Sequence, residues 1–179
     1  MIEKAKIFAA EAHKGQKRKN SNTDYIVHPE RVAESLLKAG FRPEVVCAGY
    51  LHDVVEDTSY TLKDIEKAFG EEVKALVDAH TEDKSKSWQE RKSHTIQSVR
   101  EGSVEIKALI VADKLDNLQS LSQDLEVYGD KIWSNFNADY QHQEWYYQSV
   151  AEVMGVGLKE KDVPAFFHTY RKLVKQTFD

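Results

Sequence analysis

The 179 residues are enough for one domain with a sizeable hydrophobic core, and the hydrophobic and charged fractions are ordinary for a globular protein. The formal net charge of −5 at pH 7 argues against a general nucleic-acid-binding protein. No apolar run approaches the roughly 20 residues of a membrane span, and the lone Cys47 excludes both a disulfide framework and a cysteine-based zinc site.

The first residues of the chain, Met1 to Lys6, lack the apolar core of a signal peptide. We therefore expect a cytoplasmic protein whose partners include neither a membrane nor a nucleic acid. The composition is also compatible with a homo-oligomer.

Helical periodicity dominates the chain, because only three prolines and eight glycines interrupt it and no Asn-Gly or Asp-Gly hairpin signal occurs. This pattern predicts one all-α domain over residues 1–179, with about eight to ten helices. Thr61, with Asp64 at the capping-box position, and Ser103 are expected N-caps, and Asp162 and Pro164 are expected to cap and begin the last helix. The expected helices cover residues 2–13, 29–39, 43–56, 61–69, 71–82, 88–100, 104–121, 131–154 and 162–177.

A histidine and an aspartate, His52 and Asp53, directly follow the apolar stretch 45–51. Burying them unpaired would cost several kcal/mol each, and a divalent cation is a suitable partner for imidazole and carboxylate together. Glu56 and Asp57 follow one helical turn later on the same side, where they can face a water on the ion rather than the ion itself. The alternative is an acid-rich helix end in which His52 is a hydrogen-bonded core histidine.

A second polar break interrupts the expected helix 104–121, where Asp113 comes directly after an apolar run. Asn117 lies four residues later, so its amide points in the same direction as Asp113. A buried ion pair with Lys114 or with an early lysine is the alternative for Asp113. His28 stands at a helix start and is the remaining candidate ligand, with a helix-capping role as its alternative.

Basic residues gather in two clusters of this acidic chain. Either cluster can be solvated surface or a local docking point for a small polyanion. The early cluster contains Lys14, Lys17, Arg18 and Lys19, and the mid-chain cluster contains Lys84, Lys86, Arg91 and Lys92.

Together, His28, His52, Asp53 and Asp113 resemble the spaced H…HD…D signature of the HD-domain metal-dependent phosphohydrolases. Four stretches in order are similar to the small alarmone hydrolases, and equally to the hydrolase half of the bifunctional Rel/Spo stringent-response enzymes. These stretches are residues 16–19, 25–29, 52–58 and 112–118. The resemblance covers residues 1–121, whereas 122–179 match poorly and can reshape the pocket.

This resemblance implies a single HD-type helical bundle that binds one Mn²⁺ per chain and removes the 3′-pyrophosphate of guanosine tetra- or pentaphosphate. Asp116 stands where many relatives carry an aromatic residue or histidine. No nucleotide-synthesising domain follows, so we expect degradation only. The implied metal ligands are His28, His52, Asp53 and Asp113, the water-activating residues are Glu56 and Asp57, and the nucleotide contacts are Arg18, Lys19 and Asn117.

The chemistry of phosphate hydrolysis agrees with these residue types. A metal ion activates water and neutralises a phosphoryl oxygen, a carboxylate base aligns the water, and Lys or Arg groups balance the remaining charge. The chain has no P-loop, dinucleotide fingerprint or serine-hydrolase elbow. Two alternatives are an HD phosphohydrolase for another phosphorylated nucleotide and a non-catalytic nucleotide-binding sensor.

Overall fold

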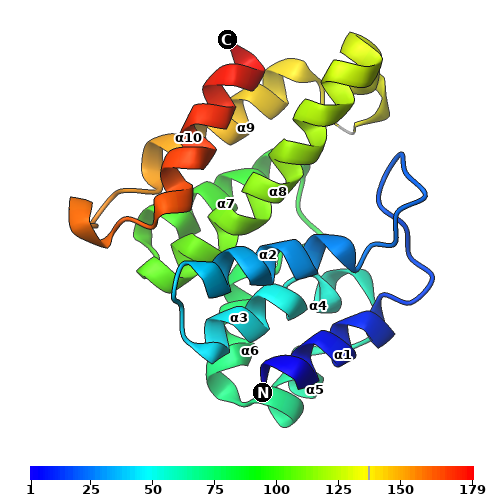
Figure 1. Cartoon of the computed structure of the whole chain (residues 1–179), viewed down its shortest axis with the longest axis vertical. Helices are drawn as coiled ribbons and strands as arrows, with labels where there is room; N and C mark the ends of the chain where they lie inside the picture. The colour runs from blue at the N-terminus through cyan, green and yellow to red at the C-terminus, as the bar shows by residue number, and fades with distance from the viewer. Residues whose placement is uncertain (137) are drawn as a thin grey trace.

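The computed structural model describes residues 1–136 and 138–179, and within them ten α-helices and two 3-10 helices make up the fold (Figure 1). One isolated β-bridge joins Lys17 to Asp24. The all-α expectation is therefore confirmed for the described part of the chain. The helices are α1 (Ile2–Ala12), α2 (Val27–Lys38), α3 (Pro43–Leu51), α4 (Val54–Asp57), α5 (Leu62–Phe69), α6 (Glu71–His80), α7 (Trp88–Glu101), α8 (Val104–Tyr128), η1 (Gly129–Asn135), α9 (Tyr140–Val153), η2 (Glu160–Asp162) and α10 (Ala165–Phe178).

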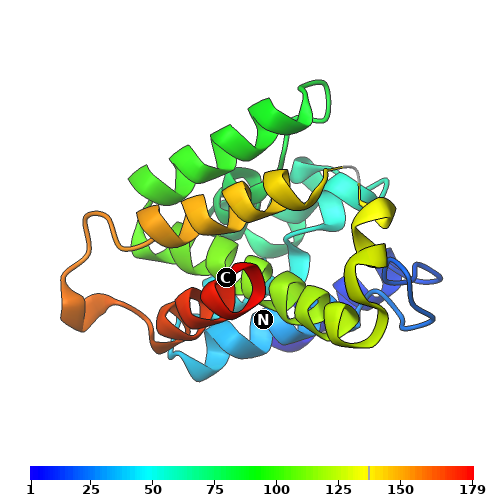
Figure 2. The same ribbon diagram turned by 90° about the horizontal axis from the view of Figure 1, so that it is seen from above.

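The long helix α8 joins the two halves of the molecule. Helices α2, α3 and α6 pack against it on one side, and α7 and α10 on the other, while α9 lies alongside α7 (Figures 1 and 2). Helix α8 is buried without interruption from Lys107 to Asp116, as expected for a helix enclosed by its neighbours. None of the described helices is long and apolar enough to traverse a bilayer.

The expected helix 43–56 is in fact two helices, α3 and α4, separated at His52 and Asp53. Asp53 has φ −103° and ψ −2°, in the bridge region between helical and extended backbone. Adjacent residues of a regular helix project about 100° apart. The break therefore allows two consecutive side chains to reach the same place.

The expected helix 131–154 is wrong as one element, because η1 and α9 are separate, and its residue 137 lies outside the described residues. Asp139 has extended backbone and is the N-cap of α9. Its side chain accepts from the backbone N–H of His142, in the first turn of that helix. The preceding helix α8 continues to Tyr128, seven residues past its expected end, and stops at Gly129 with φ +66°.

The ends of other helices follow their capping chemistry. The capping box of Thr61 and Asp64 is confirmed, and so is the Ser103 cap, which accepts from the N–H of Ile106. The roles expected at the last helix are wrong: Asp162 belongs to η2, and Pro164 is the N-cap rather than a first-turn residue.

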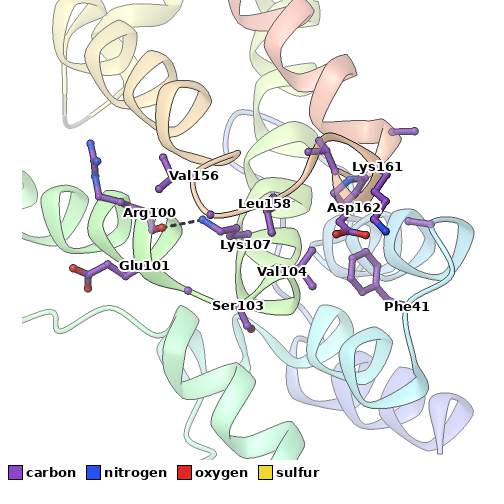
Figure 3. A pocket seen from close by; sticks show the side chains of 16 residues that line it. Phe41, Arg100, Glu101, Ser103, Val104, Lys107, Val156, Leu158, Lys161 and Asp162 are labelled. Carbon is purple, nitrogen blue, oxygen red and sulfur yellow. Dashed lines mark hydrogen bonds between the residues drawn. The ribbon is translucent and has the colours of Figure 1, made fainter.

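A cavity of about 800 Å³ lies between the turn that joins α7 to α8 and the connection from α9 to α10 (Figure 3). Buried Lys107 donates to the carbonyl oxygen of Arg100 at 3.0 Å and also to that of Val99. It thereby satisfies carbonyls at the end of α7. None of the candidate site residues lines this cavity.

At Gly49, α3 packs closely against α2. A Cβ atom there would lie 2.9 Å from the Cα of Ala33 and 3.0 Å from Cδ1 of Leu36. We expect Gly49→Ala to lower the free energy of unfolding by about 1–3 kcal/mol, as overpacking typically does, in chemical denaturation. Gly155→Ala is the matched control, because an added Cβ there meets nothing within 4 Å. Equal stability of the two variants would contradict close α2–α3 packing.

Candidate metal centre and adjoining pocket

Four buried side chains from three parts of the chain converge on one point. His28 comes from α2, His52 and Asp53 from the break between α3 and α4, and Asp113 from α8, and one ligand atom of each lies within 4.8 Å of all the others. The two Nε2 atoms are 3.2 Å apart, and Oδ1 of Asp113 lies 2.8 Å from Nε2 of His28. We call these four residues the metal cluster.

Hydrogen bonds outside the cluster fix the direction of both imidazoles. Nδ1 of His52 donates to the carbonyl oxygen of Gly49 at 2.7 Å, and because a carbonyl can only accept, Nδ1 must carry the proton. Nδ1 of His28 pairs with Oδ2 of Asp116 at 2.6 Å in the same way. Each Nε2 therefore faces the cluster, and in the neutral imidazole it carries the lone pair that a metal ligand requires.

The electrostatics of the cluster favour positive charge at its centre. Burial by itself lowers the pKa of the His52 imidazole, but Asp53 and Asp113 outweigh it and hold that pKa well above its usual range. Burial raises the pKa of the Asp113 carboxyl, but Lys114 and His52 together hold it well below its usual range. Two imidazole nitrogens and two ionised carboxylates are a suitable donor set for a divalent transition-metal ion.

Three further side chains hold the two carboxylates, and of these only Asn117 was assigned a role from the sequence. The hydroxyl of Tyr25 donates to Oδ2 of Asp53, and the amide of Asn117 donates to Oδ1 of Asp113 at 3.2 Å. Nε2 of His80 lies 2.9 Å from Oδ2 of Asp113. Tyr25 lies within a family-like stretch and so had a signal, whereas a histidine at the end of α6 had none.

Glu56 and Asp57 lie on α4, one turn beyond Asp53. Burial raises the pKa of Glu56, although its Oε1 accepts from the backbone N–H of Glu82 at 2.6 Å, which opposes the shift. Burial and then the charge of Asp53 raise the pKa of Asp57. Both carboxylates therefore accept a proton more readily than free side chains do, as a general base should.

A pocket of about 450 Å³ adjoins the metal cluster. Tyr25, Lys114 and Asn117 line the pocket and also contact a carboxylate of the cluster, with Lys114 Nζ 3.0 Å from Oδ2 of Asp113. The structure therefore brings the three sequence-predicted nucleotide contacts, Arg18, Lys19 and Asn117, together beside the cluster. The lining cations are Arg18, Lys19, Arg31, Lys92 and Lys114, and the lining aromatic residues are Tyr25, Trp88, Phe136, Tyr146 and Tyr147.

The poorly matching part of the sequence supplies six lining residues of this pocket, from the end of α8, from the residue that follows η1, and from α9. They are Gln123, Asp124, Phe136, Gln143, Tyr146 and Tyr147. Tyr146 and Tyr147 are also core residues, exposed by only 3% and 7%. Residues 122–179 therefore help to shape the pocket, as the sequence suggested.

The side chains of the two basic clusters have different surroundings. In the early cluster, Arg18 donates to Oγ of Ser120 at 3.1 Å, and Nζ of Lys19 lies 4.8 Å from the centre of the Phe136 ring. In the mid-chain cluster, Lys92 lines the pocket but is paired with Glu82 at 2.6 Å. Arg91 of the same cluster also pairs with Glu82, at 3.2 Å, so this carboxylate offsets part of the mid-chain charge.

Comparisons with known proteins agree with this geometry. The HD domain family model matches residues 5–139. Guanosine-3′,5′-bis(diphosphate) 3′-pyrophosphohydrolase MESH1 from Drosophila melanogaster is 38% identical over 151 residues, covering 83% of this chain and 82% of that protein. MESH1 from Homo sapiens has the same identity and coverage, 38% over 151 residues, 83% and 82%.

Two solved structures are similar in fold. A crystal structure of a Listeria monocytogenes EGD-e protein is 53% identical with a TM-score of 0.82, covering 84% of this chain and 98% of that one. A metazoan orthologue of SpoT that hydrolyses ppGpp is 30% identical with a TM-score of 0.77, covering 98% of this chain and 94% of that one. The second likeness extends through residues 122–179. The chain belongs to the HD domain family and is an HD phosphohydrolase related to the MESH1 and SpoT ppGpp hydrolases.

Proposed function

We propose that this protein hydrolyses guanosine tetra- and pentaphosphate by removing the 3′-pyrophosphate, with one Mn²⁺ per chain. One observation carries the proposal: Tyr25, Lys114 and Asn117 line the pocket and also contact carboxylates of the metal cluster. A nucleotide polyphosphate in the pocket would therefore have a phosphate group beside the cluster. The MESH1 relatives carry this activity in their names.

The proposed metal ligands are His28, His52, Asp53 and Asp113, whose atoms are mutually close and whose imidazoles present Nε2. When bound, a divalent ion lowers the pKa of a water molecule and neutralises a phosphoryl oxygen. We also propose that residues 1–179 act as one HD-type domain, because buried side chains from both halves belong to one hydrophobic cluster.

We assign proton transfer to Glu56, assisted by Asp57. The Glu82 N–H holds one oxygen of Glu56, which leaves the other oxygen free to take a proton from the attacking water. Water attacks the 3′-phosphorus, the bond from that phosphorus to the 3′-oxygen breaks, and the 3′-oxygen leaves with a proton. Arg18, Lys19 and Asn117 hold the nucleotide in position.

The direct test is turnover of a panel of phosphorylated nucleotides with Mn²⁺, with products identified by mass. We expect guanosine tetraphosphate to give GDP and pyrophosphate. Turnover of a different nucleotide alone would favour another HD phosphohydrolase. That alternative is supported by the six pocket-lining residues from 122–179, the part of the sequence that lacks the family-like motifs. Binding of a nucleotide without turnover would favour the sensor.

Metal removal should destabilise the protein, because an ion that binds only the folded state raises its stability by mass action. We expect chelation to lower the melting temperature of the wild type and of the control Glu126→Ala, which changes an exposed residue on the same helix as Asp113. Asp113→Ala should remove this sensitivity, measured as the difference with and without chelator in the same variant. Stoichiometric metal in Asp113→Ala would refute the four-ligand assignment.

Glu56→Gln should separate catalysis from binding. The amide oxygen can still accept from the Glu82 N–H, but it cannot take a proton. We expect Mn²⁺ content and nucleotide affinity to persist while single-turnover hydrolysis slows by roughly 10²–10⁴-fold, as on removal of a general base. Wild-type turnover would refute the role of Glu56, and loss of metal would make Glu56 a ligand or a structural support.

Lys19→Ala should mainly raise KM. Removal of one charge-assisted contact, worth roughly 1.5 kcal/mol, predicts about a tenfold increase at low salt, and the difference from wild type should shrink at high salt. Lys14→Ala is the matched control, because Lys14 is an exposed lysine of the same cluster that does not line the pocket. Equal steady-state kinetics of the two variants would mean that Lys19 is a solvated surface residue and does not contact the nucleotide.

A further inference from the structure

We infer that His80 is a positioning residue of the metal centre: it holds one oxygen of Asp113 so that the other faces the metal. The inference rests on the metal-binding part of the proposed function and does not depend on which nucleotide is the substrate. His80 lies outside the four-residue metal cluster and comes from a different helix, α6.

The two oxygens of Asp113 have different surroundings. Oδ1 lies 2.8 Å from Nε2 of His28 and 3.4 Å from Nε2 of His52, so it faces the centre of the cluster. Oδ2 lies 2.9 Å from Nε2 of His80 and 3.0 Å from Nζ of Lys114. Oδ1 also accepts from the amide of Asn117 at 3.2 Å, a single bond that leaves a lone pair toward the centre of the cluster, whereas two donors occupy Oδ2.

His80 is the more rigid of these two donors. Its ring packs edge-on against the ring of His52, with centroids 4.7 Å apart and planes at 78°, and its side chain is only 7% exposed. It is the last residue of α6, and the hydroxyl of Thr81 donates back to the carbonyl oxygen of Val77 at 2.8 Å, which closes this helix end. Lys114 reaches Asp113 through a flexible side chain with four rotatable bonds, whose ordering costs more conformational entropy.

The direction of the hydrogen bond from His80 follows from its partner. A carboxylate oxygen accepts, so Nε2 carries the proton and donates to Asp113. Nδ1 of His80 is then a buried acceptor, and among the described residues it has no hydrogen-bond partner. Leaving this nitrogen unpaired costs free energy of folding. We infer that the ring is held in this orientation by the bond that Nε2 makes with Asp113. Partners that orient a metal-binding group in this way typically change metal affinity by 10–100-fold when they are removed.

The test compares Mn²⁺ dissociation constants by chelator competition, with no nucleotide present. His80→Leu removes the donor at similar volume, and we expect Mn²⁺ to bind roughly 10–100-fold more weakly. His80→Gln places an amide N–H near the position of Nε2 and should restore most of that affinity. His168→Leu, at an exposed histidine of α10, is the control and should bind Mn²⁺ as the wild type does.

If His80→Leu does not fold, His80→Asn serves in its place, because its amide is one carbon too short to reach Asp113. A purely structural role would lower the melting temperature of the chelated variants and leave Mn²⁺ affinity unchanged, which would overturn the inference. Pulsed electron paramagnetic resonance of the Mn²⁺ protein should count two histidine nitrogens. A third nitrogen that disappears in the His80 variant would make His80 a ligand and also overturn the inference. Wild type that binds Mn²⁺ but hydrolyses nothing would refute only the proposed reaction.

Discussion

The burial of α8 on all sides is the constraint on which the rest of the structure depends. Each polar side chain in its buried stretch needs a partner, because an unpaired charge there costs several kcal/mol. Lys114 pairs with Asp113 of the same helix, and the other charged side chains have partners on neighbouring helices. Lys107 satisfies the end of α7, Asp113 meets histidines from α2 and α6, and Asp116 meets His28. The positions of these polar groups along α8 therefore fix which part of each neighbouring helix must lie against it.

The break between α3 and α4 satisfies a second constraint. It allows the side chains of two consecutive residues, His52 and Asp53, to reach the same site. Close packing of Gly49 against α2 brings this break next to His28, and the carbonyl of Gly49 orients His52. One small residue thus sets both the distance between two helices and the tautomer of a candidate ligand. The local helix is interrupted where the site requires it, which sequence periodicity alone does not reveal.

The sequence revealed those site residues that conflict with their surroundings. Asp53 and Asp113 stand out because each follows an apolar run, and His28 was found by its place in an ordered set of motifs. His80 gave no signal, because its contact with Asp113 spans 33 residues and a polar residue at a helix end is ordinary. The helices were predictable where apolar periodicity and caps agree, as at Thr61. The prediction for 131–154 was wrong because aromatic periodicity continued past Asp139, whose side chain instead begins a new helix.

The charges around the pocket divide into two kinds. Arg18 and Arg31 lie 3.6 and 3.8 Å from Asp116, Lys92 is paired with Glu82, and Lys114 with Asp113. Among the described residues that line the pocket, Lys19 is the cation with no carboxylate within 4.0 Å, and it rests on the Phe136 ring. Paired cations are held in place and supply directed hydrogen bonds, whereas an unpaired ammonium adds long-range attraction that salt can screen. The paired cations therefore position a bound polyanion, whereas Lys19 attracts it from a distance. This attraction depends on the loop between α1 and α2, which carries Lys19.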